Sequence, residues 1–141
     1  MILISHRGNI SGPNQSMENH PDYILTALKG GFDVEIDFWC VKKKLFLGHD
    51  YPQYPIKKNF LNNKKLWLHA KNLEGLIFLN NTSCNYFWHE KDSFTITSKG
   101  YIWTYPGKEL SKFAICVLPE RFNWKKTKCI GICSDFIKNY K

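Results

Sequence analysis

The chain has 141 residues, of which 43% are hydrophobic and 16% aromatic, which predicts a single domain with a packed core over residues 1–141. Its 20 Lys and Arg exceed its 12 Asp and Glu, and the formal net charge of +8 favours anionic partners. It has no apolar stretch near the ~20 residues that span a bilayer and no basic leader before an apolar region, so a cytoplasmic location is expected.

Short segments dense in β-branched and aromatic residues recur along the chain, and each is followed by polar or turn residues, a pattern typical of strands. They are residues 2–6, 32–38, 65–71, 86–90, 94–98, 101–106, 113–120 and 129–135. Residues 38–50 indicate a hairpin after the second of these strands.

Two helices are predicted between the strands. The first opens at Pro21, after the candidate caps Asn19 and His20, and stops at Gly30 and Gly31. The second covers residues 72–80, after the third strand.

Alternation of strand, helix and strand in the first half of the chain predicts parallel pairing, and eight strands suggest a barrel. A full (β/α)8 barrel takes ~250 residues, and the gaps after the fourth strand are too short for complete helices. We therefore expect an α/β fold, a minimal (β/α)8 TIM-type barrel with several helices shortened or missing.

Two acids share one face of the second strand. Side chains alternate along a strand, so Glu35 and Asp37 point one way while Val34 and Ile36 point the other. Carboxylates at this spacing suit a divalent cation with oxygen ligands. The alternative is a pair of solvated acids, but the flanking apolar residues favour burial.

Four of the five histidines lie at or just beyond predicted strand ends: His6, His49, His69 and His89. The carboxyl ends of strands in a parallel barrel open onto one rim, where active sites lie. A lone histidine is more often structural, yet this grouping predicts a site.

Several motifs together resemble one enzyme family. They are SHRG at 5–8, MEN at 17–19, DVEID at 33–37, GHD at 48–50, Lys71 near the end of the third strand, and GICSD at 131–135. In this order they are similar to the glycerophosphodiester phosphodiesterases, of which this chain would be an unusually short member. The resemblance implies a phospholipase-C-like phosphodiesterase TIM barrel.

The resemblance also implies roles for single residues. His6 and His49 would be the catalytic acid and base, because an imidazole with a pKa of ~6.5 exchanges protons near neutral pH. Glu35 and Asp37 would bind a divalent metal. Arg7 and Lys71 would neutralise the phosphate oxygens.

Other residues are candidates for substrate binding. Glu18 would orient Arg7 or contact the substrate, with a helix-start acid as the alternative. His89, Trp103 and Tyr105 would line the pocket, although such aromatics are more often core.

Two further acids have expected roles. Asp135 matches the aspartate of the family's last strand, and Asp50 would orient the neighbouring His49. Turn or cap residues are an equal alternative for both.

One position departs from the family pattern. A third carboxylate usually stands two residues before the lysine of the third strand, and here that residue is His69. The resemblance implies one divalent metal ion, Mg or Ca, whereas an imidazole ligand makes Mn or Zn possible.

These observations predict a metal-dependent phosphodiesterase that hydrolyses a glycerophosphodiester-like alkyl phosphodiester. An inactive barrel that binds an anionic phosphate ligand or nucleic acid is the alternative, and a nuclease that uses the same residues is a third hypothesis. Basic clusters at 41–45, 56–66 and 123–129 permit a nucleic-acid surface. Nevertheless, we expect a small diester substrate and no stable nucleic-acid or membrane partner.

Overall fold

The computed structural model describes residues 1–122 and 128–141, so most of the basic cluster at 123–129 lies outside the described residues. The strands are β1 Ile2–His6, β2 Asp33–Val41, β3 Lys44–Leu47, β4 Tyr54–Ile56, β5 Leu66–Ala70, β6 Asn85–Trp88, β7 Phe94–Ile96, β8 Ile102–Thr104, β9 Ala114–Val117 and β10 Gly131–Ser134. The helices are α1 Pro21–Lys29 and α2 Leu73–Asn80, with short 3-10 turns η1 Lys58–Asn62, η2 Pro119–Arg121 and η3 Ile137–Tyr140.

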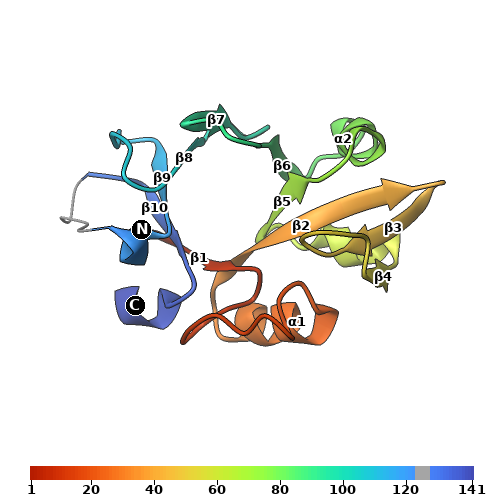
Figure 1. The fold of residues 1–141 in the computed structure, drawn as a ribbon, viewed down its shortest axis with the longest axis horizontal. Coiled ribbons are helices and arrows are strands. Elements are labelled where there is room, and N and C mark those ends of the chain that lie inside the picture. Colours follow the sequence, from red (N-terminus) through yellow and green to blue (C-terminus); the bar gives the residue numbers. More distant parts are fainter. Residues whose placement is uncertain (123–127) are drawn as a thin grey trace.

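All ten strands belong to one sheet, which curls around a central axis (Figure 1). Along the path β6, β5, β2, β1, β10, β9 and β8, every neighbouring pair is parallel. Strand β7 runs antiparallel to β8. Strands β3 and β4 form an antiparallel extension from the carboxyl-terminal part of β2. The first strand thus lies between the second strand and the last.

The expected (β/α)8 TIM-type barrel is wrong. The described residues contain two short α-helices, too few for that fold, and the sheet is a mixed, curled half-barrel rather than an all-parallel one. The physical reason is the length of the connections. Residues 97–101 between β7 and β8, for example, hold a turn, because so short a segment cannot form a crossover helix.

The two faces of the sheet bury different side chains. Val34 and Ile36 of β2 pack in one apolar cluster with Ile24 and Ala27 of α1. Strands β1, β5, β8 and β9 send Ile4, Trp67, Trp103 and Ile115 into a second cluster inside the curl. The predicted alternation along β2 is confirmed, because Glu35 faces a pocket inside the curl while its neighbours face the helices.

Each predicted strand segment contains a strand, and both helices and the β2–β3 hairpin are present. His20 caps α1, since its Nδ1 accepts a hydrogen bond from the backbone N–H of Asp22 at 3.2 Å. Asn19, the other candidate cap, has a different role, described below. Strand β4 was not predicted, because Tyr54–Ile56 is short and contains a proline.

No helix in the described part of the chain is both long and apolar enough to cross a membrane. None of the five cysteines is in a disulfide, and Cys40, Cys116 and Cys133 are buried.

Candidate metal and phosphate site

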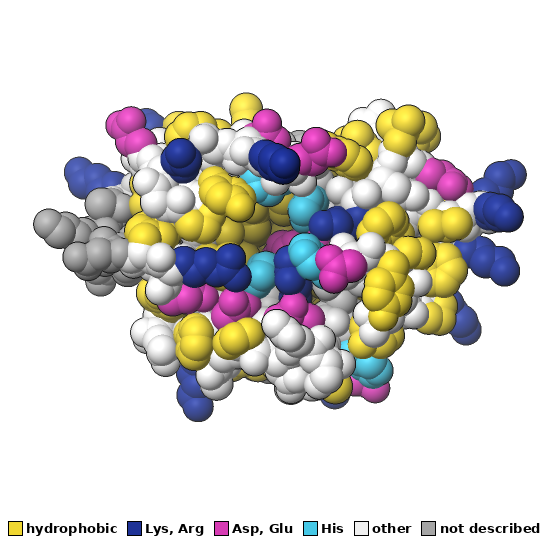
Figure 2. Space-filling view, in the orientation of Figure 1, with side chains coloured by type: hydrophobic (Ala, Val, Ile, Leu, Met, Phe, Trp, Pro, Cys, Tyr) yellow, Lys and Arg dark blue, Asp and Glu magenta, His cyan; other side chains and the backbone are white. Residues whose placement is uncertain are grey.

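A pocket of about 460 Å³ opens at the carboxyl ends of the parallel strands, the usual ligand position in sheets of this kind. Figure 2 shows the hollow, with histidines and side chains of both charges gathered around it. All the residues predicted for catalysis, metal binding or substrate binding line it except Glu18 and Asp37: His6, Arg7, Glu35, His49, His69, Lys71, His89, Trp103 and Tyr105.

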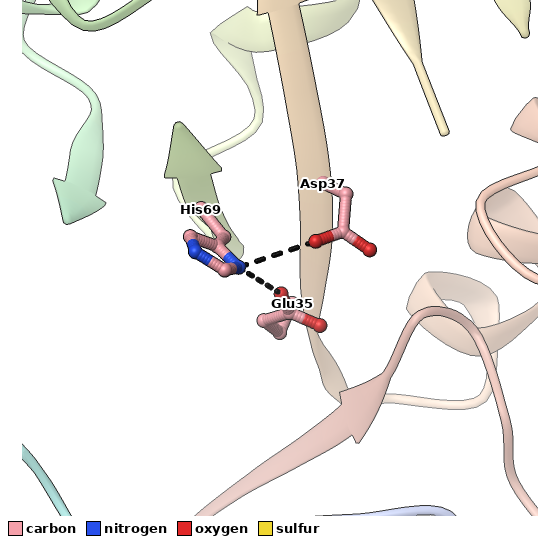
Figure 3. A group of neighbouring side chains, drawn as sticks. All are labelled: Glu35, Asp37 and His69. Carbon is pink, nitrogen blue, oxygen red and sulfur yellow. Dashed lines mark ion pairs between the residues drawn. The ribbon is translucent and has the colours of Figure 1, made fainter. Parts of the chain in front are cut away.

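Glu35 and Asp37 of β2 and His69 of β5 form a group that could hold a metal ion. Their ligand atoms all lie within 4.8 Å of one another, and the three side chains point toward one another (Figure 3). Nδ1 of His69 is 3.2 Å from Oδ1 of Asp37 and 3.9 Å from Oε1 of Glu35. Strand register explains this, because Asp37 pairs directly with His69.

The backbone fixes the orientation of the His69 ring. Its Nε2 lies 2.8 Å from the carbonyl oxygen of His89 and must donate, because a carbonyl can only accept. The ring also stacks on Phe87, with centroids 5.1 Å apart. Nδ1 is therefore the nitrogen presented to the two carboxylates, and a backbone partner on the other nitrogen is typical of histidines that bind metals.

The electrostatics of the two acids also fit a cation. Burial and the nearby charge of Asp37 raise the pKa of Glu35. Burial alone would raise the pKa of Asp37, but its hydrogen bond with His49, its contact with His69 and the charge of Arg7 hold it well below its ordinary value. Oε2 of Glu35 and Oδ1 of Asp37 are buried, and neither has a hydrogen-bond partner among the described residues.

His6 is held by Asp135, the residue that follows the last strand. Its Nδ1 is 2.7 Å from Oδ1 of Asp135, and its Nε2 is 3.9 Å from Oε2 of Glu35. Burial by itself lowers the pKa of His6, but the hydrogen bond to Asp135 and the charge of Glu35 outweigh it, so the pKa is raised. With Nδ1 engaged, Nε2 is the atom free to exchange a proton in the pocket.

His49 follows the β3 strand and is more exposed. Its Nδ1 lies 3.2 Å from Oδ2 of Asp37, and its Nε2 lies 3.3 Å from Nη2 of Arg7. Because the guanidinium can only donate, Nε2 of His49 accepts this hydrogen bond. Asp50, the residue expected to orient this ring, lies 3.7 Å from Nε2, and Asp37 is the closer carboxylate.

Arg7 turns into the site through a left-handed backbone, with φ of 53°. Its Nε is 3.0 Å from Oδ2 of Asp37, and its Nη1 donates to Oε2 of Glu18 at 3.0 Å. Gly8, at φ of 95°, completes the turn, and a Cβ there would lie 2.6 Å from the Tyr23 ring. Only glycine fits that position.

Lys71 and Glu18 differ in position. Nζ of Lys71 is 3.5 Å from Oδ1 of Asp37 and borders the pocket. Glu18 lies behind Arg7, where its other oxygen accepts a hydrogen bond from Asn9 at 2.9 Å. Glu18 therefore holds Arg7 in position and does not line the pocket.

The predicted aromatic wall consists of one buried and one exposed residue. Trp103 is only 4% exposed and packs on Phe87, with ring centroids 4.6 Å apart. Tyr105 is 45% exposed at the rim, its ring 5.2 Å from that of His89. Burial and the charge of His69 lower the pKa of His89, which favours its neutral form.

Sequence reasoning missed three residues that organise the site. Asn19 exchanges two hydrogen bonds of 2.9 Å with Asp37, one to the carboxylate and one from the backbone N–H. Asn9 donates to both Glu18 and Asp135, and Glu120 accepts from the backbone N–H of Asp135 at 2.8 Å. The one sequence signal was the MEN motif, in which Asn19 follows Glu18.

Scans against protein-family models, curated proteins and solved structures each found no match to this chain.

Proposed function

We propose that the protein is a metal-dependent phosphodiesterase that hydrolyses an alkyl phosphodiester, a compound of the glycerophosphodiester kind. The observation that carries the proposal is the convergence in one pocket of three kinds of group: two imidazoles, a carboxylate–imidazole ligand set, and two cations. Each kind has a separate task in phosphodiester hydrolysis.

The excess of acids at the site supports a bound metal ion. Two positive side chains, Arg7 and Lys71, lie among four carboxylates: Glu18, Glu35, Asp37 and Asp135. Glu35, Asp37 and His69 would hold a divalent ion. A mixed oxygen and nitrogen set suits Mn²⁺ or Zn²⁺ better than Ca²⁺.

A bound divalent ion polarises a phosphoryl oxygen and lowers the pKa of a bound water or hydroxyl. Two positively charged side chains of the protein would act on the same phosphoryl oxygens. The Arg7 guanidinium and the Lys71 ammonium border the pocket and would stabilise the non-bridging oxygens as charge builds in the transition state.

The two imidazoles would move the protons. A carboxylate holds Nδ1 of each ring, Asp135 for His6 and Asp37 for His49. Nε2 of His49 lies against Arg7, so both groups meet at the same edge of the pocket. One would take the proton of the attacking hydroxyl and the other would protonate the leaving alkoxide. Positioned groups of this kind contribute about a hundredfold or more to the rate.

Hydrolysis of bis(p-nitrophenyl) phosphate and of glycerophosphodiesters tests the proposal. Chelator-stripped protein would receive Mg, Ca, Mn or Zn in turn, and we expect turnover that depends on the metal. The variants His6→Asn and His49→Asn should each lose about a hundredfold or more of kcat.

The matched control is His20→Asn, because His20 lies at the start of α1 outside the pocket and asparagine is a strong cap. Its activity should stay at the wild-type level. Turnover that survives both site variants would refute the proposal, and so would its absence with every metal and both substrate types. A protein that binds these diesters without cleaving them would be a binding module instead.

A further inference from the structure

Arg121 is a third cation at the pocket and has no part in the scheme above. It is the last residue of η2, the turn that follows β9, and it lines the pocket with Leu118. Arg121 is exposed, as expected of a side chain at the mouth of the pocket.

The turn that carries Arg121 is held in a strained form. Leu118 has φ of 47° and ψ of 55°, a left-handed conformation that is unfavourable for a leucine. The backbone N–H of Leu118 donates to the carbonyl of Cys133 at 2.7 Å. Strain of this kind persists where surrounding contacts impose it, and it gathers at ligand sites.

Glu120 supplies further contacts. One of its oxygens accepts from the Ser134 hydroxyl at 2.9 Å and the other from the backbone N–H of Asp135 at 2.8 Å. Asp135 in turn holds His6. The turn that carries Arg121 is thus hydrogen-bonded, through Glu120, to the residue that holds the His6 ring.

The charge of Arg121 is unlike those of the other two cations. Arg7 pairs with Asp37 and Glu18, and Lys71 pairs with Asp37. Within residues 1–122 and 128–141, no carboxylate forms an ion pair with Arg121, although its charge contributes to the lowered pKa of Asp135. The pocket therefore has one cation whose charge the described residues leave available to a ligand.

We propose that Arg121 binds a second anionic group on the substrate, so that the preferred diester carries a carboxylate or another phosphate in one of its alcohol parts. The inference rests on the proposed function, because it takes the phosphodiester itself to lie at Arg7, Lys71 and the ligand set. A guanidinium suits this task, since it can bind a carboxylate or phosphate through two parallel hydrogen bonds.

Binding to two matched diesters tests this without turnover. Chelator-stripped protein would be titrated by calorimetry with butyl methyl phosphate and with carboxypropyl methyl phosphate, which differ in a terminal carboxylate. We expect the wild-type protein to bind the carboxylate compound about tenfold more tightly at low salt. In Arg121→Gln the two affinities should become equal, with that for butyl methyl phosphate unchanged.

Lys112→Gln is the control, because Lys112 is an exposed cation that contacts Phe113 and lies outside the pocket. It should keep the wild-type preference. No gain from the carboxylate in the wild-type protein, or a gain that persists in Arg121→Gln, would overturn the proposal. Failure of hydrolysis with every metal would count against the proposed function alone, since this readout needs no cleavage.

Discussion

At the scale of single residues, the His6–Asp135 pair links stability to pH. The pKa of His6 is raised and that of Asp135 is lowered. A raised histidine pKa means that the stabilisation is complete below the ordinary value of 6.5 and is lost as pH rises through the folded-state pKa. For Asp135 the stabilisation is present above the ordinary 3.8 and is lost as pH falls through the lowered pKa.

Asp135→Asn should therefore destabilise the metal-free protein most between these two limits, by about 1–3 kcal/mol. Urea unfolding of both proteins on either side of pH 6.5 measures the difference, which should shrink on the alkaline side. A difference that stays constant across this range would show that the pair is not charged in the folded state.

Asn19 is the second residue with a measurable role. It is fully buried, has φ of 64° and forms two hydrogen bonds with Asp37, one as donor and one as acceptor. Asn19→Ala should cost about 3 kcal/mol in the free energy of unfolding, because it removes both bonds and places alanine in a left-handed conformation.

Asn19→Gly separates the two causes, since glycine adopts that backbone freely. It should lose less than the alanine variant does. Asn139→Ala, at an exposed asparagine near the end of the described residues, should stay within about 0.5 kcal/mol of wild type. Chemical denaturation gives all three values, and an unchanged Asn19→Ala would contradict the role assigned to this side chain.

At the scale of elements, the β2–β3 hairpin has an unusual turn. Lys42 and Lys43 both have positive φ, 50° and 64°, the backbone of a type I′ turn that normally takes Asn-Gly. Glu74 of α2 offsets the poor turn residues, because its carboxylate accepts hydrogen bonds from both backbone N–H groups.

Lys43→Gly should stabilise the protein by about 0.5–1 kcal/mol, since glycine removes the left-handed strain and leaves the Glu74 bonds intact. Lys44→Gly, one residue later within β3, should destabilise it by a similar amount. Thermal unfolding of the pair tests this, and equal shifts for both would mean that the turn geometry is not limiting.

The elements also show where sequence reasoning works. Alternation along β2 is a local property, so it correctly placed Glu35 and Asp37 on one side of the strand, whereas His69 entered as a ligand only through its position in the family pattern. The roles of Asn19 and Glu120 were not predicted because they depend on turns and on contacts between distant segments. The fold class failed for a related reason: local patterns locate strands, but they did not show that β7 would run antiparallel.

At the scale of the whole molecule, metal binding should stabilise the fold. An ion that binds the folded state alone adds about 2.7 kcal/mol at a concentration a hundred times its dissociation constant. We expect the melting temperature of chelator-stripped protein to rise with the ion that the proposed ligand set binds.

Glu35→Gln should lose that rise, because it removes the charge of a proposed ligand. Its metal-free form should be no less stable than the metal-free wild type, since the raised pKa of Glu35 indicates that a negative charge is unfavourable at this buried position. Glu109→Gln, at an exposed acid outside the pocket, should keep the full rise. An equal rise in all three proteins would place the ion elsewhere.

The position of β1 between β2 and β10 has a consequence for how the chain folds. His6 and its partner Asp135 are 129 residues apart in sequence, and pairings at such separation form slowly. A folding intermediate that has docked β1, β2 and β5 would bring the ligand set together but would leave His6 without its anchor. Under the proposed function, catalytic competence would therefore require that β10 has joined the sheet.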